Sequence, residues 1–253
     1  MVNSARQDQI FTLLENHEKM SVEELANHFH VTETTIRRDL ISMEEKQQII
    51  GKRGYAILPD RSYGQQTRRR NTHQEEKARI AAKAFELFSG VHSMALDSGT
   101  TIGELVRHLV DQHSELQLQL VTCSLLTAYD TCRYFNTSIP GGIVFPDETS
   151  CGGPYMSDFF SNVTTDVAFL GSTGIANTPG LTVSYPPMLD VKRAMMACAT
   201  KRVGLLDSSK FLTRGIYTFC TFDELDVLIT VKTEENARAL DEIAKHNVEI
   251  VLA

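Results

Sequence analysis

The stretch that most constrains this chain is residues 21–40, SVEELANHFHVTETTIRRDL, because its apolar and capping positions fit two short helices joined by a tight turn. Ser21 can cap the first helix, and Glu24, three positions later, completes a capping box. After a turn at 30–31, Thr32 can cap the second helix. The pattern therefore predicts a helix-turn-helix.

Helical spacing assigns the side chains of this motif to an inner and an outer face. The inner positions are Val22, Leu25, Ala26, Phe29, Ile36, Leu40 and Met43. The outer positions of the second helix include Glu33, Thr34, Arg37 and Arg38. In such a motif the start of the second helix enters the major groove, where hydroxyls meet base edges or phosphates and arginine grips guanine or a phosphate in two places. The alternative is an ordinary helical hairpin with a solvated charged face.

A β-hairpin with a basic tip is predicted after the second helix. Apolar residues at 49–50 and 56–58 flank a Gly-Lys-Arg-Gly tip at 51–54, whose glycines permit the tight turn. Such a wing would lay Lys52 and Arg53 along the DNA backbone or minor groove, and contacts of that kind position a protein without reading the sequence. The predicted DNA-binding residues are Thr32, Thr34, Thr35, Arg37, Arg38, Lys52 and Arg53.

The same residues resemble the N-terminal signature of the DeoR family of bacterial transcription regulators. The resemblance rests on Glu24-Leu25-Ala26, Phe29, Val31 and Thr35-Ile36-Arg37-Arg38-Asp39-Leu40. It continues through 49–56, where the family usually carries a glycine turn and a Gly-Gly-Ala ending. Here Gln47 or Gln48 stands near the usual turn glycine, and Tyr55 replaces the second glycine. The resemblance implies a winged DNA-binding head.

The net charge of −7 argues at first sight against a nucleic-acid partner. Binding depends, however, on the positive charge that reaches phosphates. Basic residues gather at Arg37-Arg38, Lys52-Arg53 and Arg68-Arg69-Arg70. Because the overall charge is unfavourable for a monomer on DNA, we expect a homo-oligomer, a dimer or tetramer that places two recognition helices on a repeated site.

Composition further limits the class of protein. The hydrophobic content of 42% is typical of a soluble globular protein. No apolar run approaches the roughly 20 residues of a membrane span, and the start lacks the regions of a signal peptide, so we expect a cytoplasmic protein with no membrane partner. The five cysteines are widely spaced and include no C-x-x-C pair, which favours reduced, mostly buried thiols over a disulfide framework or a zinc site. We expect no cofactor and no metal.

Three segments of different pattern divide the chain. Residues 1–59 hold the head, which begins with an amphipathic helix over 3–17. Residues 60–73 are polar and aperiodic, and are predicted to be a linker. From 74 to 253, helices alternate with short apolar strands, which indicates an α/β domain with a parallel sheet covered on both faces. One helix is defined by Lys77, Ile80, Ala81, Ala84, Phe85 and Phe88, and further helices are expected at 101–110, 125–134, 187–199 and 234–246. Strands are expected at 93–96, 118–121, 143–145, 167–170, 202–206, 227–230 and 248–252.

Four of the predicted strands end in hydroxyl-rich segments. These are Asp97-Ser98-Gly99-Thr100-Thr101, Thr122-Cys123-Ser124, Gly171-Ser172-Thr173-Gly174 and Asp207-Ser208-Ser209-Lys210. The carboxyl ends of parallel strands meet at one edge of a sheet, where ligands bind. Glycine turns and helix starts make anion sites there, Lys210 can meet a phosphate, and Asp207 can bind sugar hydroxyls. Each segment alone is explained by a helix cap, but the coincidence of four favours a polar phosphorylated ligand.

Through these segments the resemblance to the DeoR family covers nearly the whole chain. It rests on Asp97 to Thr101, Asp166 to Gly171, Gly180 to Thr182, Asp190 to Met195 and Asp207 to Phe211. It implies a Rossmann-like effector domain similar to the sugar-phosphate isomerase fold, and a repressor of a carbohydrate catabolic operon that a phosphorylated sugar or related metabolite controls. The expected effector-binding residues are Asp97, Ser98, Gly99, Thr100, Thr101, Thr122, Ser124, Gly171, Ser172, Asp207 and Lys210. Cys123 and Leu212 depart from the family pattern, which favours a pocket adapted to an unusual effector.

The alternative from another class is a sugar-phosphate isomerase fused to a DNA-binding module. Isomerisation needs a positioned carboxylate base. The isomerase pattern supplies acids at the places that here read GSTG, over 171–174, and VSY, over 183–185. Asp166 and Asp190 remain at positions that favour structural roles. A kinase or dehydrogenase is disfavoured because no G-x-x-x-x-G-K-[ST] is present and no G-x-G-x-x-G follows a strand. The sequence therefore predicts binding without catalysis.

Overall fold

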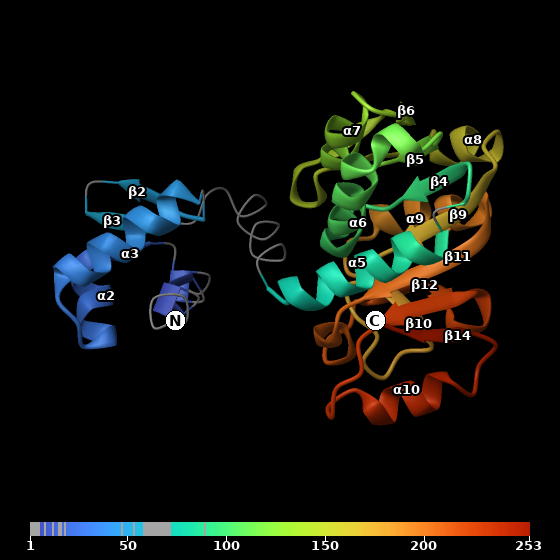
Figure 1. The fold of residues 1–253 in the computed structure, drawn as a ribbon. Helices are drawn as coiled ribbons and strands as arrows, with labels where there is room; N and C mark the ends of the chain where they lie inside the picture. The colour runs from blue at the N-terminus through green and yellow to red at the C-terminus, as the bar shows by residue number, and fades with distance from the viewer. Residues whose placement is uncertain are drawn as a thin grey trace. The chain divides into compact units, whose positions relative to one another are not determined.

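The computed structural model describes residues 6–7, 9–11, 13–14, 17, 19–46, 48–52, 54–57, 72–88 and 90–253. The chain divides into two compact units, Met1–Asn71 and Thr72–Ala253 (Figure 1). Most of the predicted linker, including its three arginines, lies outside the described residues, and so does Arg53. The predicted boundaries at 59 and 73 stay a prediction.

The first unit contains the predicted helix-turn-helix and wing. Its elements are β1 (Met20–Ser21), α2 (Val22–Phe29), α3 (Glu33–Glu45), β2 (Ile50–Lys52) and β3 (Tyr55–Ile57), with the strands in the order β1-β3-β2. Both predicted caps are present: Ser21 and Glu24 form a reciprocal capping box, and the Thr32 hydroxyl accepts from the Thr35 backbone N–H. His30 ends α2 in the left-handed region, with φ of 52°. Local sequence therefore sets the geometry of the turn.

The predicted inner face of the motif is the core of this unit. Ile36, Leu40 and Met43 of α3 are buried, together with Leu25 of α2 and with Ile10. Asp39 lies on the same face and is only 1% exposed. Its carboxylate accepts a hydrogen bond from Arg6 Nε at 2.5 Å, which ties the N-terminal helical residues to the back of α3. The sequence did not predict this pair.

The second unit is built on a seven-stranded sheet in the order β14-β13-β11-β9-β4-β5-β6. The strands are β4 (Ser93–Leu96), β5 (Gln119–Thr122), β6 (Asn136–Ser138), β9 (Thr165–Leu170), β11 (Ala199–Leu206), β13 (Val227–Thr230) and β14 (Glu249–Leu252). Every neighbouring pair is parallel, which confirms the predicted α/β class. No helix among the described residues is long and apolar enough to cross a membrane.

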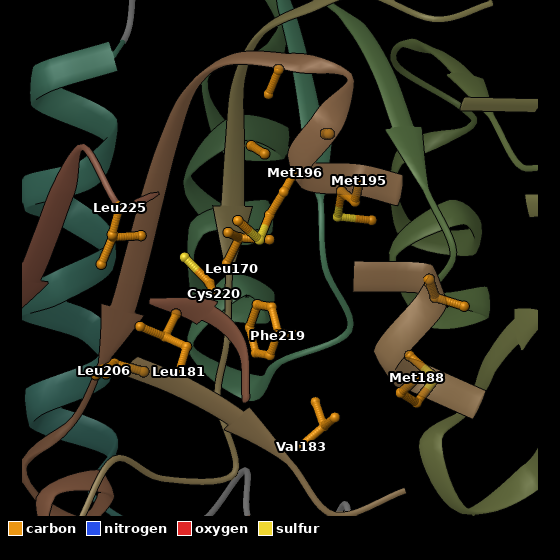
Figure 2. Packing of buried hydrophobic residues seen from close by; sticks show 14 of the residues in the cluster. Leu170, Leu181, Val183, Met188, Met195, Met196, Leu206, Phe219, Cys220 and Leu225 are labelled. Carbon is orange, nitrogen blue, oxygen red and sulfur yellow. The ribbon is translucent and has the colours of Figure 1, made fainter. Parts of the chain in front are cut away.

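Two apolar cores cover the two faces of this sheet, because successive strand residues point to opposite sides. Phe169 and Leu205 pack with α5 (Gln74–Phe88) and α6 (Thr100–Asp111). Their neighbours Leu170 and Leu206 pack on the other face, with Met195 (Figure 2). The elements on that face include α8 (Met156–Ser161), α9 (Pro187–Ala197), α10 (Ala237–Ile243), β10 (Gly180–Val183) and β12 (Tyr217–Thr221).

Several elements differ from the sequence predictions. The strand at 143–145, β7 (Ile143–Phe145), pairs antiparallel with β8 (Ser150–Gly152) in a separate hairpin and does not join the main sheet. The helices predicted at 125–134 and 234–246 are shorter, as α7 (Leu125–Thr131) and α10 show. The prediction missed β6, β8, β10, β12 and α8. These elements have three to six residues, too few for a periodic apolar pattern.

The order of strands reverses between β4 and β9. The chain runs outward from β4 through β5 and β6, then returns to the other side of β4 and continues through β9, β11, β13 and β14. In open α/β sheets, ligands bind at the carboxyl edge where the order reverses. Asp97 follows β4 and Gly171 follows β9, so two of the predicted ligand segments lie at this point.

Asp166, in β9, serves the packing of two strands. Its Oδ2 accepts hydrogen bonds from the backbone N–H groups of His92 and Ser93, at 2.8 and 2.9 Å, and from the Ser93 hydroxyl. These bonds, with the His92 N–H first, lower the pKa of Asp166 below the usual range of an aspartate. The contacts lie at the amino ends of β4 and β9, away from the carboxyl edge.

We expect Asp166→Asn to lower the free energy of unfolding by about 0.5–1 kcal/mol at pH 7, since charged acceptors form stronger bonds but this side chain is exposed and screened. A depressed folded-state pKa gives stability that is full above the unfolded value and is lost as pH falls through the folded value. The difference between the two proteins should therefore shrink below about pH 4. Urea denaturation of both proteins at pH 7 and at pH 3.5 measures this difference in the free energy of unfolding. A difference that grows on acidification would contradict this assignment.

Candidate ligand site and nucleic-acid interface

The outer face of α3 presents the side chains predicted to contact DNA. Thr34, Arg37 and Arg38 are exposed. The Arg37 guanidinium is 3.1 Å from the Glu33 carboxylate, and both side chains are more than half exposed. Such a pair contributes little stability, so Arg37 can exchange Glu33 for an external anion. The Thr32 and Thr35 hydroxyls lie 3.0 Å apart at the helix start, where Thr32 acts as the cap.

The wing is attached to α3 through its backbone. Gly51 N–H donates to Glu44 Oε1 at 3.1 Å, and Gly54 turns the hairpin with φ of +89°. Tyr55, which stands where the family usually has glycine, is exposed, and Lys19 Nζ lies 5.2 Å from its ring centroid. The predicted contacts of Lys52 and Arg53 stay predictions, because Arg53 lies outside the described residues.

Asp97 is the centre of the carboxyl edge of the larger sheet. It is 1% exposed, and its Oδ2 accepts from the Gly171 N–H at 2.8 Å and from Lys192 Nζ. Lys192 lies on α9, donates to the Gly171 carbonyl at 3.0 Å, and has its Nζ 5.0 Å from the centroid of the Phe219 ring. A buried carboxylate and a buried ammonium thus compensate each other and join β4, β9 and α9.

Two glycines let the strand ends approach. A Cβ on Gly99 would lie 2.8 Å from Ile102 Cδ1, and a Cβ on Gly171 would lie 3.4 Å from the Gly99 Cα. Gly99 is also the N-cap of α6 and provides no side-chain cap, whereas Ser21, Thr32 and Ser124 cap their helices. The first N–H groups of α6 therefore lack a capping side chain, and a helix start of this kind attracts anions.

Three hydroxyls of the predicted set, those of Thr122, Ser124 and Ser172, take part in bonds within the protein. Thr122 Oγ1 donates to the Leu96 carbonyl at 2.6 Å, and Ser124 Oγ accepts from the Thr127 N–H to cap α7. Ser172 Oγ donates to the Gly174 carbonyl at 2.9 Å and so shapes the loop after β9. These bonds position the strand ends, and ligand contacts from these residues stay predictions.

Asp207, Lys210 and Lys77 gather after β11. Asp207 is 1% exposed and its Oδ1 accepts from the Ser209 N–H at 3.1 Å, while Lys210 is half-buried in the same turn. Lys77 of α5 is 2% exposed. Its burial lowers the pKa of the ammonium, the nearby Asp207 opposes that effect, and the nearby Lys210 adds to it. Buried charges that interact in this way are typical of functional sites.

Glu76 extends this cluster to the start of α5. Its Oε2 accepts from the Ser208 N–H at 2.8 Å and its Oε1 from the Ser208 hydroxyl at 2.9 Å. His73, Glu76 and Asp207 each place one potential metal ligand within 4.8 Å of the others. Ser208 donates to both oxygens of Glu76, and the Lys77 ammonium interacts electrostatically with Asp207, so both carboxylates already have partners within the protein.

Sequence reasoning missed Lys192 and Lys77 as members of the site, and it missed Glu76 as a neighbour that contacts Ser208. Both lysines lie on the apolar stripe of a helix: Lys192 lies beside Val191 and Met195, and Lys77 one turn before Ile80. Lysine is almost never fully buried unless it is paired. A lysine at an inward helical position was therefore the signal available in the sequence. No comparable signal identifies Glu76, which begins a helix where acids are common.

The places that hold acids in the isomerase pattern contain none here. The loop after β9 reads Gly171 to Gly174, and β10 is followed by Ser184 and Tyr185. Asp190 is exposed on α9. The two acids at the carboxyl edge, Asp97 and Asp207, are buried and engaged in hydrogen bonds. Among the described residues, these two carboxylates therefore accept hydrogen bonds that position the strand ends.

Comparison with known proteins follows the same division of the chain. Residues 6–62 match the DeoR-like helix-turn-helix domain, and residues 72–232 match the DeoR C terminal sensor domain. The HTH-type transcriptional repressor GlcR of Bacillus subtilis is 27% identical over 259 residues, which cover 100% of this chain and 97% of that protein. The glycerol-3-phosphate regulon repressor of Escherichia coli is 29% identical over 231 residues, 91% of each chain. Ribose 5-phosphate isomerase A of Methanocaldococcus jannaschii aligns over 55% of each chain, with 17% identity and a TM-score of 0.42.

Lys192→Met should lower the free energy of unfolding by about 3–5 kcal/mol, because it leaves the Asp97 carboxylate buried without its partner. The double variant Asp97→Asn with Lys192→Met should recover a large part of that loss, since no unpaired charge remains. Urea denaturation of the four proteins of this cycle measures the coupling. Lys245→Met is the control, because its pair with Glu242 is mostly exposed and should give no measurable change. Additive effects of the two single changes would rule out the pairing.

Proposed function

This chain belongs to the DeoR family of transcription regulators, and on that basis we propose that it represses a carbohydrate catabolic operon under the control of a phosphorylated sugar or related metabolite. The winged head binds double-stranded operator DNA in the cytoplasm. The effector binds at the carboxyl edge of the larger sheet.

One observation carries the effector proposal: the polar segments follow four adjacent strands, β11-β9-β4-β5, with the uncapped start of α6 at the strand reversal. Lys77 interacts electrostatically with Asp207 and Lys210, and also with Glu104 of α6. Positive charge and free helix N–H groups therefore meet at one edge. A phosphate is the group that such an edge binds best.

The relatives support the same chemical class. The name of the Escherichia coli relative connects that protein to the glycerol-3-phosphate regulon, and the name of the Bacillus subtilis relative identifies that protein as a repressor. For this chain we infer a small phosphorylated metabolite. A sugar-phosphate isomerase is the less favoured alternative, because the two buried acids of the edge are committed to Lys192, Gly171 and Ser209.

On the DNA side, α3 would lie in the major groove with Thr34, Arg37 and Arg38 toward bases and phosphates. A dimer or tetramer would place two such helices on repeated half-sites, which doubles the number of basic side chains that reach phosphates although each chain carries a net charge of −7. Effector binding changes operator affinity if it favours one relative arrangement of domains or subunits over another. The resulting change in operator affinity is typically about 1–3 kcal/mol.

A thermal-shift screen tests the effector proposal, with phosphorylated sugars and polyols compared with their unphosphorylated counterparts. A ligand at about 100 times its Kd should stabilise the protein by roughly 2.7 kcal/mol. Each hit is checked for product formation. A phosphate-dependent shift without turnover is the expected result, turnover would establish the isomerase alternative, and no shift with any phosphorylated compound would refute the proposed ligand class.

Arg37→Ala should weaken binding to a duplex selected by this protein from a random pool by about 1–3 kcal/mol, if Arg37 makes a bidentate base contact. Fluorescence anisotropy at fixed salt gives the affinity. Glu33→Ala is the matched control: it removes the partner of Arg37 and one negative charge, so affinity should hold or rise. Unchanged affinity in the Arg37 variant would show that α3 is not the recognition helix.

Lys210→Ala should leave affinity for the same duplex unchanged and abolish the response to the phosphorylated ligand, because the variant lacks a cation of the proposed phosphate site. Lys201→Ala is the control, since Lys201 is an exposed lysine nearer the amino end of the same strand, β11. Gel shifts with and without ligand measure both properties. A normal response in the Lys210 variant would remove this lysine from the site.

A further inference from the structure

The start of α5 contacts the end of β11 across 132 residues of sequence. Glu76 accepts two hydrogen bonds from Ser208, one from its backbone N–H at 2.8 Å and one from its hydroxyl at 2.9 Å. Ser208 follows Asp207 and begins the short turn η3 (Ser208–Phe211), which also contains Lys210. A change in the conformation of this turn would therefore alter the hydrogen bonds of the Glu76 carboxylate directly.

The first turn of α5 also contacts Thr72 and His73, the first two residues of the second unit. His73 Nδ1 lies 3.1 Å from Glu76 Oε1, and Lys77 Nζ donates to the Thr72 carbonyl at 2.7 Å. His73 adopts φ of 53°, a conformation that non-glycine residues rarely take unless other contacts impose it. Thr72 and His73 are thus held by the two side chains that face Ser208 and Asp207.

We propose that Glu76 is a positioning residue: through its bonds to Ser208 and His73 it couples effector binding at the turn after β11 to the conformation of residues 72–73, the entry from the DNA-binding head. This inference rests on the proposed function for its ligand. The hydrogen bonds of Glu76 to Ser208 and its contact with His73 do not depend on a ligand.

The location of this contact explains why it suits a regulatory role. Thr72 and His73 are the first residues of the second unit, which begins at Thr72. Glu76 is intermediate in exposure, with 23% of its side chain exposed, so its bonds to Ser208 can break without leaving a buried charge unsolvated. Allosteric coupling requires an element with two arrangements that both sites bias. The Glu76 side chain would be such an element, with its hydrogen bonds to Ser208 formed in one arrangement and broken in the other.

The test compares Glu76→Gln and Ser208→Ala with a matched control elsewhere in the unit. Glu224 accepts from the Thr221 N–H and hydroxyl, both at 2.8 Å, which are the same two kinds of donor that Ser208 offers to Glu76. Glu224→Gln therefore removes the negative charge from the same kind of interaction, at a position far in sequence from residues 72–77. Neither Glu76 nor Ser208 belongs to the proposed ligand-binding or DNA-binding residues.

The first measurement is amide hydrogen exchange of the ligand-free proteins. Ser208→Ala should raise exchange in residues 72–77 at least threefold, and Glu76→Gln should do the same in residues 207–211. Glu224→Gln should change neither segment. If Ser208→Ala affects only its own turn, the coupling is absent and the inference is wrong. This result does not depend on any effector.

The second measurement uses the phosphorylated hit of the thermal-shift screen and the selected duplex. Wild-type protein should lose operator affinity by about 5- to 150-fold when ligand saturates it. In Glu76→Gln and Ser208→Ala, the loss of operator affinity that ligand causes should fall below twofold. The Kd for the ligand and the operator affinity without ligand should each change by less than threefold. Glu224→Gln should retain the wild-type ratio.

The possible failures of this experiment are distinguishable. A missing response in the wild-type protein would overturn the proposed function, and hydrogen exchange would then decide the coupling by itself. A wild-type response that survives in Glu76→Gln would overturn the positioning role of Glu76. Loss of ligand binding in Glu76→Gln would also overturn it, because Glu76 would then belong to the ligand site.

Discussion

The carboxyl edge of the larger unit depends on the buried carboxylate of Asp97. A buried charge is destabilising unless it is paired and hydrogen-bonded, and here Lys192 and the Gly171 N–H meet both requirements. The pair fixes the ends of β4 and β9 at the point where the strand order reverses. It therefore also fixes the start of α6, three residues after Asp97, and with it the N–H groups that we propose bind an anion.

A second charged group, around Lys77, Asp207 and Lys210, gives this edge its link to the rest of the chain. Lys77 lies on α5, the first helix of the unit, and Asp207 and Lys210 follow β11. Because Glu76 and Lys77 are adjacent, the helix that meets the proposed ligand site also holds Thr72 and His73. A ligand that rearranges this group can therefore affect Thr72 and His73 without a motion of the sheet. The free energy required for regulation is small compared with that of folding.

Local features of the sequence predicted the head and the fold class. Ser21 with Glu24, and Thr32, specify helix starts within a few residues, and the apolar strands of the sheet are recognisable as short runs. Partners distant in sequence could not be predicted in this way. Lys192 is 95 residues from Asp97, and the pairing of β10 with β12 requires such close backbone approach that a Cβ on Gly180 would lie 1.9 Å from the Cys220 carbonyl. Sequence identifies polar strand ends but not which hydroxyls, such as that of Thr122, are used within the protein.

The central claim is that a phosphorylated ligand at this edge controls the binding of DNA. Its most direct test is the affinity of the wild-type protein for its selected duplex, measured at saturating concentrations of a phosphorylated sugar and of the same sugar without phosphate. We expect only the phosphorylated compound to change the affinity, by about 1–3 kcal/mol. Equal effects of the two compounds, or no effect of either across the sugars that bind, would contradict it.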